Sequence, residues 1–185
     1  EQAENRIDSL MYWCKDFNHM FPEMKYQRLV KDGLEIMLHE TYAVNWYSHL
    51  DNEGNRYGVL DDGNSFGIYS MSWETAYWIA EVNKWDLHDR EDELRLMSDT
   101  HEQTKYAIWY LYWLLNFMES KAENKGVNLS IRDLRLAMID GYNLPSIDPT
   151  KERDRKYFFV VFGRISYQDV LIKQKVNEVF NWSVI

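Results

Sequence analysis

The sequence predicts an α+β fold: a mainly helical domain with an aromatic-rich core and a small antiparallel β-sheet. Apolar residues recur at helical spacing in several segments, and two clusters of turn-forming residues bracket short β-prone segments in the first half. Hydrophobic residues make up 45% of the chain and aromatic residues 16%, which is enough for one large core. Because the chain has 185 residues, we expect residues 1–185 to form a single domain.

The first segment is predicted to be an amphipathic helix over 3–17 with Cys14 on its buried face. Residues 22–50 allow two interpretations. Asp32-Gly33 can form a hairpin turn between two short strands, or Gly33 can end one helix before another begins. We favour a helix over 34–47, where apolar residues fit a helical period.

The next segment contains the β-structure. Turn-forming residues cluster at 51–55 and 61–64, and the segments 56–60 and 65–69 between and after them are β-prone. This pattern predicts a small antiparallel meander.

Two helices are expected to follow. Ser72 is a suitable N-cap for the first, which we expect to be buried on two faces, the second of them lined by Trp78, Val82 and Trp85. The second covers 104–124 and is apolar all round in its first half, so it is expected to lie at the centre of the molecule and to end at Gly126.

The last third of the chain is predicted to form a helix, a strand and a helix. Ser130 is expected to cap the first of these helices and Gly141 to end it. The continuous apolar run 157–165 is typical of a strand buried on both faces, and a final helix follows from Ser166.

Charge and composition exclude several classes of function. The net charge of −9 disfavours direct binding to nucleic acid or to an anionic membrane. The longest apolar run, 106–115, is too short to span a bilayer. Cys14 is the only cysteine, so no intramolecular disulfide can form and a cytoplasmic location is expected.

Common catalytic signatures are missing from the sequence. It contains no phosphate-binding glycine-rich loop, no dinucleotide fingerprint and no nucleophile elbow, and one cysteine cannot build a cysteine-rich zinc site. The first hypothesis is therefore a non-enzymatic binding protein that needs no cofactor.

A strongly acidic segment suggests where such a protein would bind. Residues 86–102 hold seven carboxylates against two arginines. They form either a solvated surface or a surface for a protein partner with a basic groove, in which an aromatic residue supplies affinity. The residues of the second interpretation are Trp85, Asp86, Asp89, Glu91, Asp92, Glu93 and Asp99.

A specific form of this hypothesis is an acidic inhibitor, or nucleic-acid mimic, of a protein that handles nucleic acid. The composition is similar to that of small acidic accessory proteins of phages. The many aromatic residues also leave a homodimer open.

The alternative hypothesis is an enzyme. His49, the dipeptide His88-Asp89 and Asp140 have an order that resembles the metal-binding set of HD-domain phosphohydrolases, which are helical and cleave phosphate esters. Imidazole and carboxylate groups can hold divalent ions that activate water. The sequence departs from that family because His88-Asp89 lies in a polar acidic stretch and His49 borders a turn.

Overall fold

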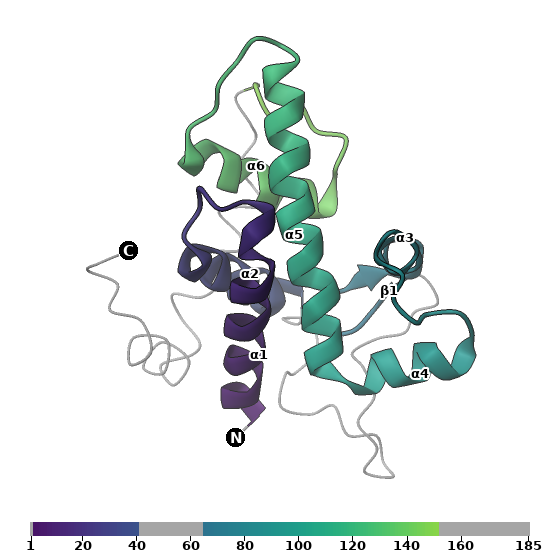
Figure 1. Ribbon diagram of the computed structural model, residues 1–185. Coiled ribbons are helices and arrows are strands. Elements are labelled where there is room, and N and C mark those ends of the chain that lie inside the picture. Colours follow the sequence, from purple (N-terminus) through teal and green to yellow (C-terminus); the bar gives the residue numbers. More distant parts are fainter. Residues whose placement is uncertain (1, 41–64, 152–185) are drawn as a thin grey trace.

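The computed structural model describes residues 2–40 and 65–151, and within them it confirms the α+β prediction (Figure 1). The described elements are α1 (Gln2–Asp16), a 3-10 helix η1 (Phe17–Met20), α2 (Tyr26–Glu40), β1 (Ser65–Phe66), β2 (Met71–Ser72), α3 (Trp73–Asn83), α4 (Arg90–Ser98), α5 (Thr100–Glu123) and α6 (Ile131–Asn143). Several predicted elements lie outside these residues: the end of the helix predicted over 34–47, the strand at 56–60, the strand at 157–165 and the final helix.

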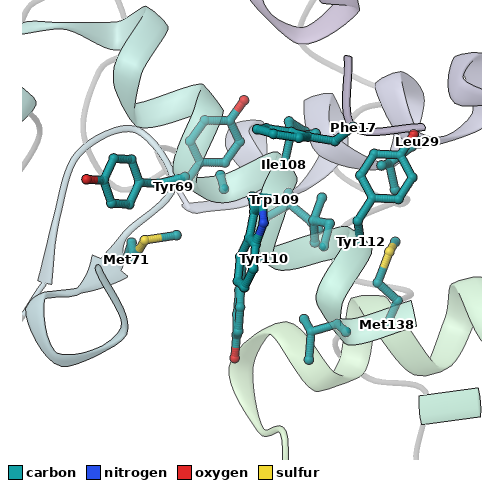
Figure 2. Packing of buried hydrophobic residues seen from close by; sticks show 14 of the residues in the cluster. Phe17, Leu29, Tyr69, Met71, Ile108, Trp109, Tyr110, Tyr112 and Met138 are labelled. Atoms are coloured by element: carbon teal, nitrogen blue, oxygen red, sulfur yellow. The ribbon is translucent and has the colours of Figure 1, made fainter. Parts of the chain in front are cut away.

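Helix α5 is the centre of the described structure, as its sequence predicts. It runs through the molecule with α1 on one side and α3 and α4 on the other, while α6 packs against its second half (Figure 1). Thirteen of its side chains are buried, and Figure 2 shows Ile108, Trp109, Tyr110 and Tyr112 among them. Its aromatic rings also contact Trp78 of α3, Tyr142 of α6 and Trp85. The helix begins at Thr100, four residues earlier than predicted. It ends as predicted: Gly126 has a φ of 72°, and the Val127 amide donates to the Ala122 carbonyl.

The few polar atoms of the α5 core are bonded to the ends of other elements. The Tyr112 hydroxyl donates to the Cys14 carbonyl at 2.7 Å, in the last turn of α1. The Asn116 amide donates to the Met20 carbonyl at the end of η1. These bonds let a helix that is apolar nearly all round keep two polar side chains without leaving buried groups unsatisfied.

The prediction for α2 is wrong at Gly33, which neither ends a helix nor forms a turn. The helix is continuous from Tyr26 to Glu40, and Gly33 lies in its interior. A Cβ atom at this position would come within 2.9 Å of a Leu10 methyl carbon in α1 and 3.0 Å of one of Ile108 in α5. Gly33 therefore allows three helices to approach closely, which outweighs its poor helix propensity.

Gly141 has a similar role in α6, so the prediction that it ends this helix is also wrong. The helix continues to Asn143, and a Cβ atom at Gly141 would overlap the terminal methyl carbon of Met118 in α5. The predicted start is confirmed, because the Ser130 side chain accepts a hydrogen bond from the Asp133 amide.

The described part of the sheet is a short hairpin. Strand β1 pairs with β2 in antiparallel register, Ser65 opposite Ser72, and Gly67 in the turn has a φ of 75°. The prediction of strand structure as far as 69 is therefore too long. Gln103 of α5 fixes this turn: its buried side chain accepts from the Ile68 amide at 3.0 Å and donates to the carbonyls of Leu96 and Met97.

A buried ion pair joins α2 to α6. The Asp32 carboxylate is fully buried and accepts two hydrogen bonds from the Arg135 guanidinium, at 2.6 and 2.8 Å. Glu35 lies one turn further along α2 and is also buried, and its Oε2 has no hydrogen-bond partner among the residues described. The Lys31 ammonium lies 3.7 Å from the other carboxylate oxygen of Glu35, Oε1. The Lys31 side chain is exposed, so solvent screens its charge. Burial, and next the charge of Asp32, raise the pKa of Glu35 to about 9.

We expect Gln103→Leu to lower the free energy of unfolding by at least about 2 kcal/mol, because it removes three hydrogen bonds from buried backbone groups. The measurement is urea denaturation followed by circular dichroism. The control is Gln27→Leu, on the half-buried side of α2, which is expected to change stability much less. Equal effects of the two substitutions would show that Gln103 does not connect the hairpin to α5.

We also expect the free energy of unfolding to fall as pH rises from about 4.5 towards about 9, because folded Glu35 keeps a proton that the unfolded chain loses. The slope contributed by one such group is about 1.4 kcal/mol per pH unit. Glu35→Gln cannot lose a proton, so its denaturation midpoint should depend less on pH. An unchanged pH dependence in Glu35→Gln, with Glu23→Gln as the exposed control, would contradict the raised pKa.

Candidate interaction surface

The candidate site is a pocket between one face of α3 and the segment that leads to α4. Its volume is about 680 Å³. Residues at helical spacing on α3 form one wall, and the chain after the end of α3 forms another. The residues that line it are Glu74, Tyr77, Trp78, Ala80, Glu81, Lys84, Trp85, Leu87 and His88.

Local sequence places α3 and turns the chain after it. Ser72 has extended backbone and its side chain accepts from the Thr75 amide, so the predicted N-cap is confirmed. Lys84 ends the helix in the left-handed conformation, with a φ of 59°, and its amide donates to the Glu81 carbonyl. The next amide, that of Trp85, donates back to the Ala80 carbonyl at 2.9 Å. These bonds bring Trp85 back beside the helix.

Three aromatic residues form the apolar wall of the pocket. Trp78 meets Trp113 of α5 edge to face, with ring centroids 4.9 Å apart. Trp85 meets Tyr106 of α5 at the same distance, also edge to face. Both tryptophans and Tyr77 are half-buried, so each ring has one part in the core and another at the surface. Such rings lose little conformational freedom when a ligand binds.

The expectation of a second buried face on α3 is therefore only partly met. Trp78 packs against the core as predicted, but Val82 is 52% exposed. Trp85 lies beyond the end of the helix and does not line its face. Instead, the ammonium group of Lys105 lies 4.1 Å from the centroid of the Trp85 ring. Trp85 is thus partly occupied by contacts within the chain and is not a fully free anchor.

The acidic segment contains a helix, α4, that was not predicted from the sequence. Asp89 is its N-cap and accepts from the amides of Glu91 and Asp92. Three carboxylates lie in its first turn and Arg95 in its last, an arrangement that complements the helix dipole. The capping residue and this order of charges are visible in the sequence, and they are the signals from which α4 could have been predicted.

Several carboxylates of the predicted acidic surface have structural partners. Glu93 accepts from the Tyr77 hydroxyl at 2.8 Å and pairs with Arg90, and Asp92 pairs with Arg95 at 3.1 Å. The hydrogen bond to Glu93 raises the pKa of Tyr77. Asp99 is half-buried and caps α5 by accepting from two backbone amides.

The remaining carboxylates of this region face solvent. Three members of the predicted set are exposed: Asp86, Asp89 and Glu91. Two further carboxylates on α3, Glu74 and Glu81, are also exposed, and they were not in the predicted set. Residues 74–99 carry eight carboxylates and three basic side chains, a net charge of −5 in a chain whose total is −9. Glu74 and Glu81 share the face of α3 that carries Tyr77 and Trp78, as their seven-residue spacing indicates.

The alternative metal site is not assembled in the described part of the chain. His88 is exposed and lies 3.8 Å from Asp86, and Asp89 caps α4. Asp140 is in α6, and His49 lies outside the described residues. Over 2–40 and 65–151, no three His, Cys, Asp or Glu side chains are grouped so that they could hold a metal ion.

The surface as a whole combines a preformed aromatic pocket with carboxylates at its rim. Such a site suits a cationic group better than an anionic or purely apolar one, because aromatic faces and carboxylates both attract positive charge. Among the helices described, none is both long enough and apolar enough to cross a membrane. Comparisons of the chain with protein-family models, with curated proteins and with solved structures found no match.

We expect Asp89→Ala to lower the free energy of unfolding by about 1 kcal/mol, because it removes the N-cap of α4. Asp86→Ala is the control, since the Asp86 side chain is exposed and, among the residues described, makes only a long contact with His88. Thermal unfolding of both variants measures the difference. If Asp86→Ala destabilises the protein as much as Asp89→Ala, the capping role of Asp89 is wrong.

Proposed function

We propose that this chain is a non-enzymatic binding protein that engages a basic surface of a partner protein. The surface it uses, called here the α3–α4 surface, consists of the pocket beside α3 and the exposed carboxylates of residues 74–91. The observation that carries the proposal is that residues 74–99, with a net charge of −5, include an aromatic pocket formed by residues 74–88. Carboxylates at the rim speed encounter and select positive partners, while rigid aromatic residues at the centre supply affinity.

The proposal differs in its residues from the one that the sequence alone suggested. Asp89 and Asp99 cap helices, Glu93 joins α4 to α3 through Tyr77, and Asp92 pairs with Arg95 within α4. The exposed carboxylates of α3, together with Asp86 and Glu91, are better placed to meet a partner. A second copy of this chain is a poor partner for this surface, because two surfaces of charge −5 repel each other.

A more specific form of the proposal concerns the class of partner. A protein that handles nucleic acid presents a groove lined by lysine and arginine, and a compact acidic surface can occupy it in place of phosphates. The protein would then act as an inhibitor of that partner inside the cytoplasm. Its support is the charge distribution of residues 74–99.

We expect the triple variant Glu81→Lys, Asp86→Lys, Glu91→Lys to bind a basic peptide at least about tenfold more weakly than the unchanged protein. The probe is a fluorescent peptide in which glycine alternates with equal numbers of lysine and arginine, and fluorescence anisotropy measures its Kd. Binding should also weaken as salt is added, because exposed charges are screened.

The control variant is Asp8→Lys, Glu23→Lys, Glu123→Lys, which changes the net charge by the same amount on exposed positions of other helices or loops. We expect its Kd to stay within about twofold of the unchanged protein's. If the two variants lose affinity equally, the peptide responds only to total charge, and the α3–α4 surface is not the binding site. Circular dichroism confirms that both variants remain folded.

A further inference from the structure

The pocket beside α3 has a composition that indicates which part of a basic partner it receives. Tyr77, Trp78 and Trp85 supply aromatic surface, and Glu74 and Glu81 supply negative charge on the same helix face. We propose that this pocket binds an arginine side chain of the partner, with the guanidinium against the aromatic wall and paired with a carboxylate of α3. This inference rests on the proposed function and deepens it.

The geometry of α3 allows both contacts to be made at once. Glu74 and Glu81 are seven residues apart, which separates their backbone positions by roughly 10 Å along the helix axis. Tyr77 and Trp78 lie between them on the same face. A side chain that enters beside either glutamate therefore reaches an aromatic ring and a carboxylate together, and the pocket volume of about 680 Å³ leaves room for it.

The rings that form the wall are held in place from behind. Trp78 contacts both Trp109 and Trp113 of α5, and Trp85 contacts Tyr106. The Tyr77 hydroxyl is fixed by its hydrogen bond to Glu93. Because these contacts exist without any ligand, binding needs little reordering of the site, which favours affinity.

The same combination of groups already holds a cation within this chain. The Lys105 ammonium lies 4.1 Å from the centroid of the Trp85 ring and 3.4 Å from a carboxylate oxygen of Glu102. A tryptophan face and a glutamate thus share one positive side chain in the folded protein. The pocket offers similar groups, Trp78 and Glu81, to a side chain from outside.

Charge and shape favour arginine over other occupants. Lys84 and His88 also line the pocket, but so do Glu74 and Glu81, and residues 86–91 carry three more exposed carboxylates. The guanidinium is planar, so it can stack on an aromatic face while its edge donates two hydrogen bonds to a carboxylate. A lysine ammonium can contact a ring and a carboxylate, as Lys105 does, but it cannot lie flat on the ring or donate a paired set of hydrogen bonds from one planar edge, and it is more strongly hydrated.

The experiment uses three synthetic peptides and the full chain. In the first peptide arginine alternates with glycine, in the second lysine replaces arginine, and in the third citrulline replaces it, a neutral group of nearly the same shape. Isothermal titration calorimetry measures each Kd. We expect the arginine peptide to bind several-fold more tightly than the lysine peptide, and the citrulline peptide to show no measurable binding.

The site is tested by the double variant Glu74→Gln, Glu81→Gln, which keeps the shape of both side chains. We expect it to weaken arginine-peptide binding by about tenfold or more, because it removes the charge-assisted hydrogen bonds. The control is Glu23→Gln, Glu123→Gln, with the same change in net charge elsewhere. A second readout is the NMR signals of the Trp78 and Trp85 indole N–H groups, assigned with Trp→Phe variants. These signals should shift when the arginine peptide is added and stay in place when the citrulline peptide is added.

The outcomes separate this inference from the proposed function. If the double variant binds arginine as tightly as the unchanged protein, or if lysine binds as tightly as arginine, the arginine pocket is wrong. The proposed function still stands in that case, provided that the triple reversal of Glu81, Asp86 and Glu91 weakens binding selectively. If neither set of substitutions affects binding, or if no basic peptide binds, both proposals are overturned.

Discussion

Burial of α5 on nearly all sides is the constraint on which the rest of the described structure depends. A helix that presents apolar side chains in every direction must be covered from every direction, because each exposed ring or leucine would leave apolar surface in water. Helices α1, α3, α4 and α6 therefore all contact it (Figure 1). The polar groups that remain on α5 then have to be satisfied by its neighbours, as Tyr112 and Asn116 are.

This arrangement links the core to the candidate site. Trp78 and Trp85 belong to the aromatic cluster around α5, and they also form the wall of the pocket. The packing that stabilises α3 against α5 thus also fixes the positions of the rings on which the proposed binding depends. The acidic residues divide in a comparable way: Asp89 and Asp99 maintain helix ends, while Glu74, Glu81 and Glu91 face solvent.

The mistaken predictions have two physical causes. Gly33 and Gly141 were interpreted as chain breaks, since glycine is a poor helix former, but the structure uses them where helices approach too closely for a Cβ atom. Such a requirement depends on a neighbour distant in sequence. Helix α4 was missed because its polar, charged residues suggest solvent exposure, although its cap and its charge order indicated a helix. Only Leu96 and Met97 of α4 are buried, so its apolar periodicity is weak.

The sequence by itself determined the fold class, the position and burial of α5, the caps at Ser72 and Ser130, and the concentration of negative charge in residues 86–102, because these follow from local spacing and residue type. Tertiary structure alone decided which of these carboxylates are exposed and which have partners within the chain. It also decided that Glu74 and Glu81 join an aromatic pocket, that Asp32 pairs with Arg135, and that His88 and Asp140 lie in elements that build no common metal site within the residues described. The reason is that exposure and pairing depend on contacts between residues far apart in the chain, and no local pattern records them.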